Sequence, residues 1–166
     1  MENRKGTVSV FNGPPPKVMG YKSEESEIAG VAGWIKSRID EGILPHELAL
    51  FVRSNEQIDR AISACKLAGV AFSVLDEKVT SEPTTISISA MHLAKGLEFR
   101  AVAVMACDDE VVPLQERIES VSDSADLEEV YNTERHLLYV ACTRARDQLL
   151  VSGVEPKSEF LNDFRS

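Results

Sequence analysis

Apolar residues along this chain recur at two spacings, one typical of buried β-strands and one typical of amphipathic helices. Continuous apolar runs occur at Leu48–Val52 and 101–106, the pattern of strands that are covered on both faces of a sheet. Shorter segments rich in β-branched residues or alternating in polarity predict further strands at 17–22, 70–75, 85–89 and 148–152.

Three helices are predicted between these strands. Apolar residues at helical spacing follow Ser23, recur from 58 to 65, and recur again from 127 to 141. The expected N-caps are Ser23 for the first helix and Ser54 or Asn55 for the second, and the expected stops are Gly42 and Gly69. Strands and helices alternate, which predicts an α/β fold with a mainly parallel sheet and right-handed crossovers.

The remaining segments are expected to be irregular. Residues 1–16 end in Gly13 and three prolines and are interpreted as a lead-in to a domain that occupies 17–166. A polar turn is predicted at 76–83. An acidic loop is predicted at 107–125, longer than most loops of compact domains and therefore a candidate for function or mobility.

Length and charge narrow the class of protein. The 166 residues suit one domain, and the net charge of −9 argues against a simple nucleic-acid binder. Nine acids and one base, Arg117, lie between Asp108 and Glu129, so this segment alone carries −8 and the rest of the chain only −1. A local cationic groove is therefore compatible with the overall charge, and a solvated acidic face is the simpler explanation of the segment.

Other classes are disfavoured by what the sequence lacks. It contains no apolar run of transmembrane length and no secretory signal pattern, which predicts a cytoplasmic protein without a membrane partner. The three cysteines, Cys65, Cys107 and Cys142, show neither disulfide nor zinc-ligand spacing, so free thiols and no metal site are expected.

Ligands of parallel sheets bind at the carboxyl ends of the strands, and three segments are expected to combine polar groups with a strand end there. They are 50–57 (LFVRSNEQ), 91–99 (MHLAKGLEF) and 134–146 (ERHLLYVACTRAR). Each also has a structural explanation: Arg53 as a surface charge, Gly96 as a turn residue, and Arg144 as a cation that complements a helix C-terminus.

No phosphate-binding loop of the form G-x-x-x-x-G-K-[ST] is present. The apolar strand followed by Asp108 and Asp109 looks like a magnesium-binding strand end, but such a site needs that loop. The chain by its own residues is therefore not a complete nucleotide hydrolase.

Taken together and in this order, the three segments resemble motifs IV, V and VI of the UvrD/Rep/PcrA group of superfamily 1 DNA helicases. The resemblance extends over roughly 45–153 and is nearly letter for letter in the third segment. It implies a RecA-like three-layer sandwich, the second of two motor domains that move 3′ to 5′ along single-stranded DNA.

The resemblance also implies roles for individual residues. Arg53 and Arg144 would be catalytic and would reach the γ-phosphate of ATP across an interdomain cleft. Gly96 and Glu98 would contact the nucleotide, and His92 and Lys95 would contact DNA, although Lys95 fits either surface. The first motor domain, the expected partner, would supply the phosphate loop and the acids that hold Mg²⁺. A fixed guanidinium stabilises the charge that develops on a transferring phosphoryl group, which agrees with these roles.

The sequence departs from the larger helicases in two ways. Met91 follows Arg53 by only 38 positions, too few for the subdomain inserted there, and His136 stands where a second arginine is common. The first motor domain is not in this chain, so it is expected either to be part of a longer helicase or to act with a separate partner, and to be inactive alone. The alternatives are a non-enzymatic module that docks on a partner protein and a flavodoxin-like nucleotide binder.

Overall fold

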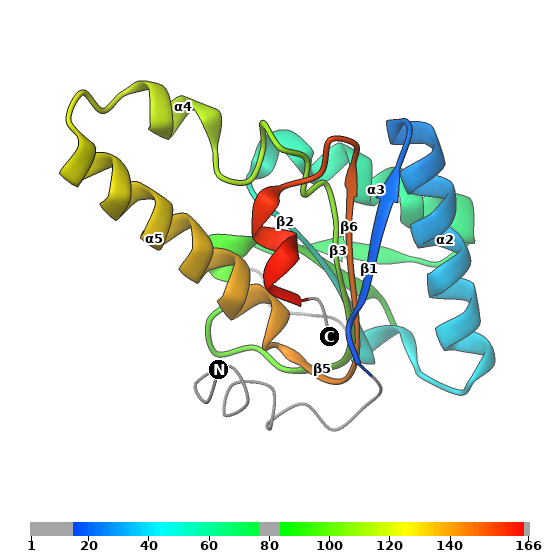
Figure 1. Ribbon diagram of the computed structural model, residues 1–166. Helices are drawn as coiled ribbons and strands as arrows, with labels where there is room; N and C mark the ends of the chain where they lie inside the picture. The colour runs from blue at the N-terminus through cyan, green and yellow to red at the C-terminus, as the bar shows by residue number, and fades with distance from the viewer. Residues whose placement is uncertain (1–14, 77–83, 165–166) are drawn as a thin grey trace.

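Six parallel strands form the central sheet of this computed structural model, which describes residues 15–76 and 84–164 (Figure 1). The strands are β1 (Lys17–Tyr21), β2 (Leu48–Val52), β3 (Phe72–Val74), β4 (Ile86–Ala90), β5 (Phe99–Val104) and β6 (Ala145–Val154). Their order is β1-β6-β5-β2-β4-β3, and every neighbouring pair is parallel. The predicted α/β class with a parallel sheet is confirmed.

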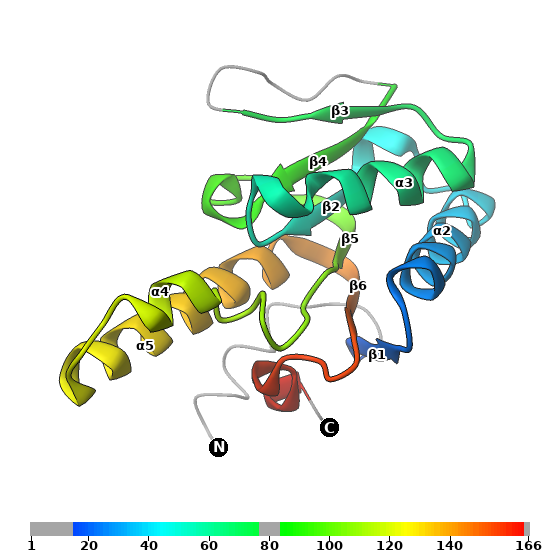
Figure 2. The ribbon, with the colours of Figure 1, turned by 90° about the horizontal axis from the view of Figure 1, so that it is seen from above.

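Helices cover both faces of the sheet, as Figure 2 shows from above. Helices α2 (Glu24–Asp40) and α3 (Ile58–Ala68) pack on one face, and α5 (Ser124–Cys142) packs on the other together with a short helical turn at Glu159–Phe164. Along β2, Leu48, Leu50 and Val52 point toward α2 and α3, whereas Ala49 and Phe51 point toward α5. The three layers are those of the predicted RecA-like sandwich.

Local sequence signals explain where the first helices begin and end. The Ser23 side chain accepts a hydrogen bond from the Ser26 backbone N–H, and Ser26 completes a capping box, so the predicted cap of α2 is confirmed. Gly42 follows the end of α2 with φ +100°, and Gly69 ends α3 with φ +75°. The backbone of both glycines lies in the left-handed region, which favours glycine at the end of a helix.

Some segments differ from the predictions. The stretch predicted as an acidic loop at 107–125 contains a short helix, α4 (Gln115–Glu119), and already includes the start of α5. Ser54 precedes a short turn at Asn55–Gln57 and makes no capping hydrogen bond with its side chain. The helical turn at Glu159–Phe164 was not expected. The predicted lead-in at 1–16 and the predicted turn at 76–83 lie mostly outside the described residues.

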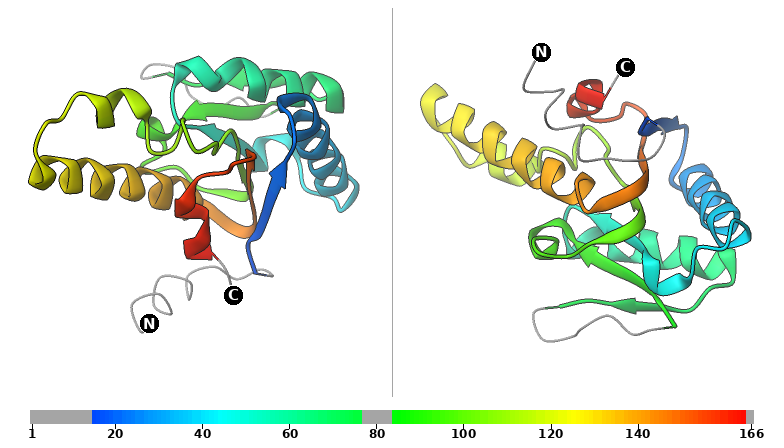
Figure 3. Two further views of the ribbon diagram at one scale, coloured as in Figure 1. Left: turned by 45° about the horizontal axis from the view of Figure 1, so that its top comes forward. Right: turned by 90° about the horizontal axis from the view of Figure 1, so that it is seen from below.

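Helix α4 and the first turns of α5 project beyond the sheet, as Figure 3 shows in two views. We call residues 115–129 the arm. It carries most of the acidic residues of the segment 108–129, and only the second half of α5 lies against the sheet (Figure 1). None of the helices in the described part of the chain has the length and apolar character needed to cross a bilayer.

Candidate functional site

A small hollow at the amino ends of β5 and β6 brings together three of the predicted site residues. Gly96, Glu98 and Arg144 line it, and its volume is about 360 Å³. We call this site the arginine hollow. Its other lining residues are Leu97, Thr143, Ala145 and Arg146.

The hollow forms because two chain segments meet where β5 and β6 begin. The Phe99 N–H donates to the Arg144 carbonyl oxygen at 2.9 Å, which joins the end of 91–99 to the end of the α5 segment. Gly96 adopts φ +86° in a turn closed by the Leu97 N–H and the Ala94 carbonyl. A Cβ at Gly96 would meet nothing within 4 Å, so this position needs glycine for its backbone conformation and not for space.

The Arg144 guanidinium is held in place by backbone carbonyls. Its Nε donates to the Val140 oxygen at 2.9 Å and its Nη1 to the Leu97 oxygen at 3.2 Å, while Nη2 lies 3.2 Å from the Thr143 hydroxyl. These partners carry no net charge, so the positive charge of Arg144 is not neutralised by a carboxylate here. A fixed cation of this kind, with Arg146 beside it, suits a phosphate group.

His92 and Lys95 lie on the same segment as Gly96. The turn at Met91–Leu93 follows the carboxyl end of β4, and the chain then crosses the α5 face of the sheet to the amino end of β5. Met91 and Ala94 are buried against this face, whereas His92 and Lys95 are exposed. One short segment therefore presents both predicted DNA contacts and ends in the arginine hollow.

Arg53 does not join Arg144, which corrects the prediction that the two converge on one phosphate. Arg53 follows the carboxyl end of β2, where Phe51 is paired with Val104, the last residue of β5. Arg144 precedes β6, whose first residue, Ala145, is paired with Phe99 at the amino end of β5, so the length of β5, about 16 Å, separates the two arginines. In addition, Arg53 is buried and its guanidinium is already occupied by Glu134.

Glu134 is the centre of a buried ionic cluster on the α5 face. Arg53 binds it bidentately at 2.8 and 2.6 Å, Arg117 donates at 2.9 Å, and the Leu114 backbone N–H donates at 2.8 Å. Burial by itself raises the pKa of Glu134, but these hydrogen bonds and the charge of Arg53 outweigh it, so the pKa lies below its usual value.

Glu134 lies in the third motif, and the sequence analysis assigns it no role. Its helical spacing from Val130 and Leu138 is the signal that places it on the buried face.

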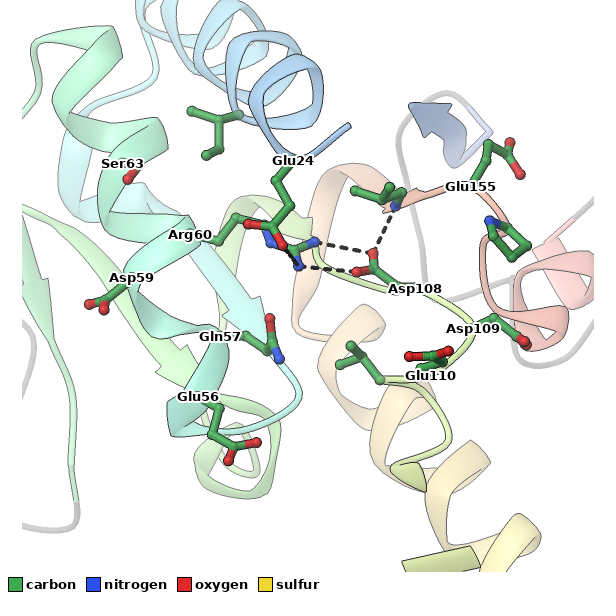
Figure 4. A pocket seen from close by; sticks show the side chains of 14 residues that line it. Glu24, Glu56, Gln57, Asp59, Arg60, Ser63, Asp108, Asp109, Glu110 and Glu155 are labelled. Atoms are coloured by element: carbon green, nitrogen blue, oxygen red, sulfur yellow. Dashed lines mark hydrogen bonds and ion pairs between the residues drawn. The ribbon is translucent and has the colours of Figure 1, made fainter. Parts of the chain in front are cut away.

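A second hollow of about 700 Å³ lies at the carboxyl edge of the sheet, on the α2 and α3 side (Figure 4). Arg60 is buried there, with Asp108 bound bidentately at 3.0 and 3.1 Å and Glu27 at 2.9 Å. Asp108 also accepts from the Val154 N–H at 2.7 Å. The acid that looks like a magnesium ligand in the sequence is thus a partner of Arg60. No group of three or more metal-ligating side chains lies within 15–76 and 84–164.

The family model that matches this chain is the UvrD-like helicase C-terminal domain, over residues 67–155. This range is just over half of the chain and contains the second and third motifs, but not Arg53.

Curated helicases are similar over the same region. A putative ATP-dependent DNA helicase, YjcD of Bacillus subtilis, is 38% identical over 78 residues, which is 46% of this chain and 10% of that protein. PcrA of the same organism is 32% identical over 84 residues, 51% of this chain and 10% of PcrA. The chain therefore matches about a tenth of the length of these relatives.

A solved structure shares the whole fold. The C-terminal domain of a possible DNA helicase from Lactobacillus plantarum WCFS1 superposes with a TM-score of 0.70 at 20% identity. The superposition covers 99% of this chain and 92% of that one. At this identity the likeness concerns the fold alone.

Proposed function

This chain belongs to the UvrD-like helicase C-terminal domain family, and from that premise we propose that it is the second motor domain of an ATP-dependent DNA helicase that moves 3′ to 5′. One observation carries the proposal: Gly96, Glu98 and Arg144, which come from two different motifs, converge on the arginine hollow. The relatives that match are ATP-dependent DNA helicases by name, which supports nucleotide use.

In this proposal the arginine hollow is half of an ATP site. Arg144 stabilises the charge on the transferring phosphoryl group, and Glu98 accepts hydrogen bonds from the ribose. The first motor domain provides the phosphate loop and the acids that bind Mg²⁺. Because Arg144 approaches from the second domain, hydrolysis depends on closure of the two domains, and chemistry is thereby coupled to movement.

Single-stranded DNA is proposed to run past His92 and Lys95. Both side chains are exposed, and a positively charged lysine attracts backbone phosphates. The segment that carries them continues into Gly96 and Glu98. A displacement of this segment when DNA binds would therefore also move residues that line the arginine hollow.

The test is an ATPase assay of the chain supplied with a first RecA-like motor domain, with and without single-stranded DNA. We expect no hydrolysis by the isolated chain, DNA-stimulated hydrolysis with the first domain, and a loss of at least ~100-fold in kcat for Arg144→Ala. Arg100→Ala is the matched control, because Arg100 lies on the adjacent strand β5 and pairs with Asp147 at 3.0 Å outside the hollow. Its turnover should stay close to that of the unmodified chain.

Normal turnover in Arg144→Ala would overturn the role of Arg144. Failure of the chain to support any ATPase activity with the first domain would favour the other class of function, a module that docks on a partner protein without catalysis.

A further inference from the structure

The buried face of α5 contains a charged residue where a core helix normally has an apolar one. Val130, Leu138 and Ala141 are buried on this face, and Glu134 lies between them with 0% of its surface exposed. A buried ion pair can often be replaced by apolar side chains of similar volume with little loss of stability. The stability of the fold alone therefore does not explain a carboxylate at this position.

An ionic contact differs from an apolar one in its directionality. Each carboxylate oxygen of Glu134 accepts two hydrogen bonds: Oε1 from Arg53 Nε and the Leu114 N–H, and Oε2 from Arg53 Nη2 and Arg117. The donors come from the end of β2 and from the start of α4. This bidentate, four-donor arrangement fixes both the height of α5 above the sheet and its rotation about its own axis.

The position of α5 in turn determines the position of Arg144. Helix α5 continues without interruption from Glu134 to Cys142, and Arg144 follows two residues later. The Arg144 side chain reaches back to the carbonyl of Val140 on the same helix and across to the carbonyl of Leu97 on the neighbouring segment. A shift or rotation of α5 would therefore move the guanidinium relative to Gly96 and Glu98.

We propose that Arg53 and Glu134 are positioning residues, whose ion pair sets α5 on the sheet and thereby places Arg144 in the arginine hollow. Arg53 thus acts on Arg144 through the helix and does not itself touch the phosphate. The importance of this placement for catalysis rests on the proposed function, since a displacement of about 1 Å can cost two orders of magnitude in rate. Glu134 also holds Arg117 of the arm, so one carboxylate contacts the end of β2 and the arm while its own helix continues to Arg144.

The test uses Arg53→Lys in the 166-residue chain, which keeps the charge but removes the two-pronged contact. Arg60→Lys is the matched control, because Arg60 is also buried and also binds a carboxylate bidentately, but on the opposite face and away from α5. Amide ¹H–¹⁵N spectra and hydrogen exchange are recorded for all three proteins. The amide of Phe99, which donates to the Arg144 carbonyl, reports the junction between the two segments.

We expect Arg53→Lys to shift the amide signals of residues 97–98 and 144–146 and to accelerate exchange at Phe99 by at least about tenfold. Arg60→Lys should leave these signals in place. Unchanged signals in Arg53→Lys, or equal changes in both variants, would overturn the proposal.

If Arg53→Lys does not fold, the double variant Arg53→Met with Glu134→Leu replaces the pair by apolar groups, and the same displacement is expected. A native-like spectrum at the arginine hollow in that variant would also overturn the proposal. An ATPase assay of the unmodified chain with the first motor domain keeps the two hypotheses apart, because missing activity there contradicts the nucleotide site without altering the result on the position of Arg144.

Discussion

Arg53 and Arg144 differ in their hydrogen-bond partners, and the partners determine whether the charge of each arginine is available to a ligand. Arg53 donates to the buried carboxylate of Glu134, so its charge is neutralised inside the protein. Arg144 donates to carbonyl oxygens, which hold the guanidinium without cancelling its charge. The residue type is the same in the two cases, although the motifs differ, and only the second arrangement leaves a fixed cation available to an anionic ligand.

Gly153 is a residue that the packing of two strand ends requires. A Cβ at this position would lie 2.4 Å from the backbone oxygen of Cys107, whereas a Cβ at Gly33 in α2 would meet nothing within 4 Å. We expect Gly153→Ala to lower the free energy of unfolding by about 1–3 kcal/mol, because backbone must move to make room. Gly33→Ala should raise it by about 0.5–1 kcal/mol, because alanine favours the helix.

Urea unfolding followed by circular dichroism measures both changes. A Gly153→Ala variant as stable as the unmodified chain would show that the approach between Cys107 and Gly153 is not tight in solution.

At the scale of elements, the cap of α2 has a measurable energetic effect. Ser23→Ala removes the side-chain acceptor of the Ser26 N–H and should cost about 1 kcal/mol in the free energy of unfolding. Ser37→Ala, at an exposed position inside the same helix, is the control and should change stability by less than about 0.5 kcal/mol. Equal effects of the two substitutions in thermal or urea unfolding would contradict the capping role of Ser23.

Hydrophobic spacing predicted most elements because it reports burial directly. The run Leu48–Val52 became β2, which is buried along its whole length, and the alternation at 85–89 became β4 with a shift of one residue. Helix α4 was missed because its five residues include three charged ones and bury none. It is held instead by long-range hydrogen bonds, such as those of Arg117 and the Leu114 N–H to Glu134, which no local pattern reveals.

The sequence predicted the part of the candidate site whose motifs lead into strands that are neighbours in the sheet. Gly96, Glu98 and Arg144 were brought together as expected, because the second and third motifs both lead into neighbouring strands. Arg53 was misplaced because the resemblance grouped it with Arg144, although one arginine follows a strand and the other precedes one. In a parallel sheet, a residue after the carboxyl end of β2 and a residue before the amino end of β6 lie at opposite ends of the strands.

At the scale of the whole molecule, two buried arginines tie the helix layers to the carboxyl edge of the sheet. Arg60 links α3 to α2 through Glu27 and to the end of β5 through Asp108. Arg53 links the end of β2 to α5 through Glu134 on the opposite face. Arg60 faces two carboxylates, whereas the single carboxylate of Glu134 faces two arginines, and in both clusters burial makes the pairing stable only while the carboxylates are ionised.

The stability of the molecule should therefore fall in acid, and Glu134 should contribute to the fall. Its pKa in the folded chain is below the ordinary value of about 4.3, so its contribution is complete above that pH and disappears as the pH drops toward the folded pKa. We expect the free energy of unfolding, measured with urea from pH 7 to pH 3, to decrease below about pH 5.

Glu134→Gln should be less stable at pH 7 and should show a shallower decrease, whereas Glu128→Gln, at an exposed position of the same helix, should follow the unmodified curve. Parallel curves for Glu134→Gln and the unmodified chain over the whole range would contradict this, because they would mean that protonation of Glu134 is not coupled to folding.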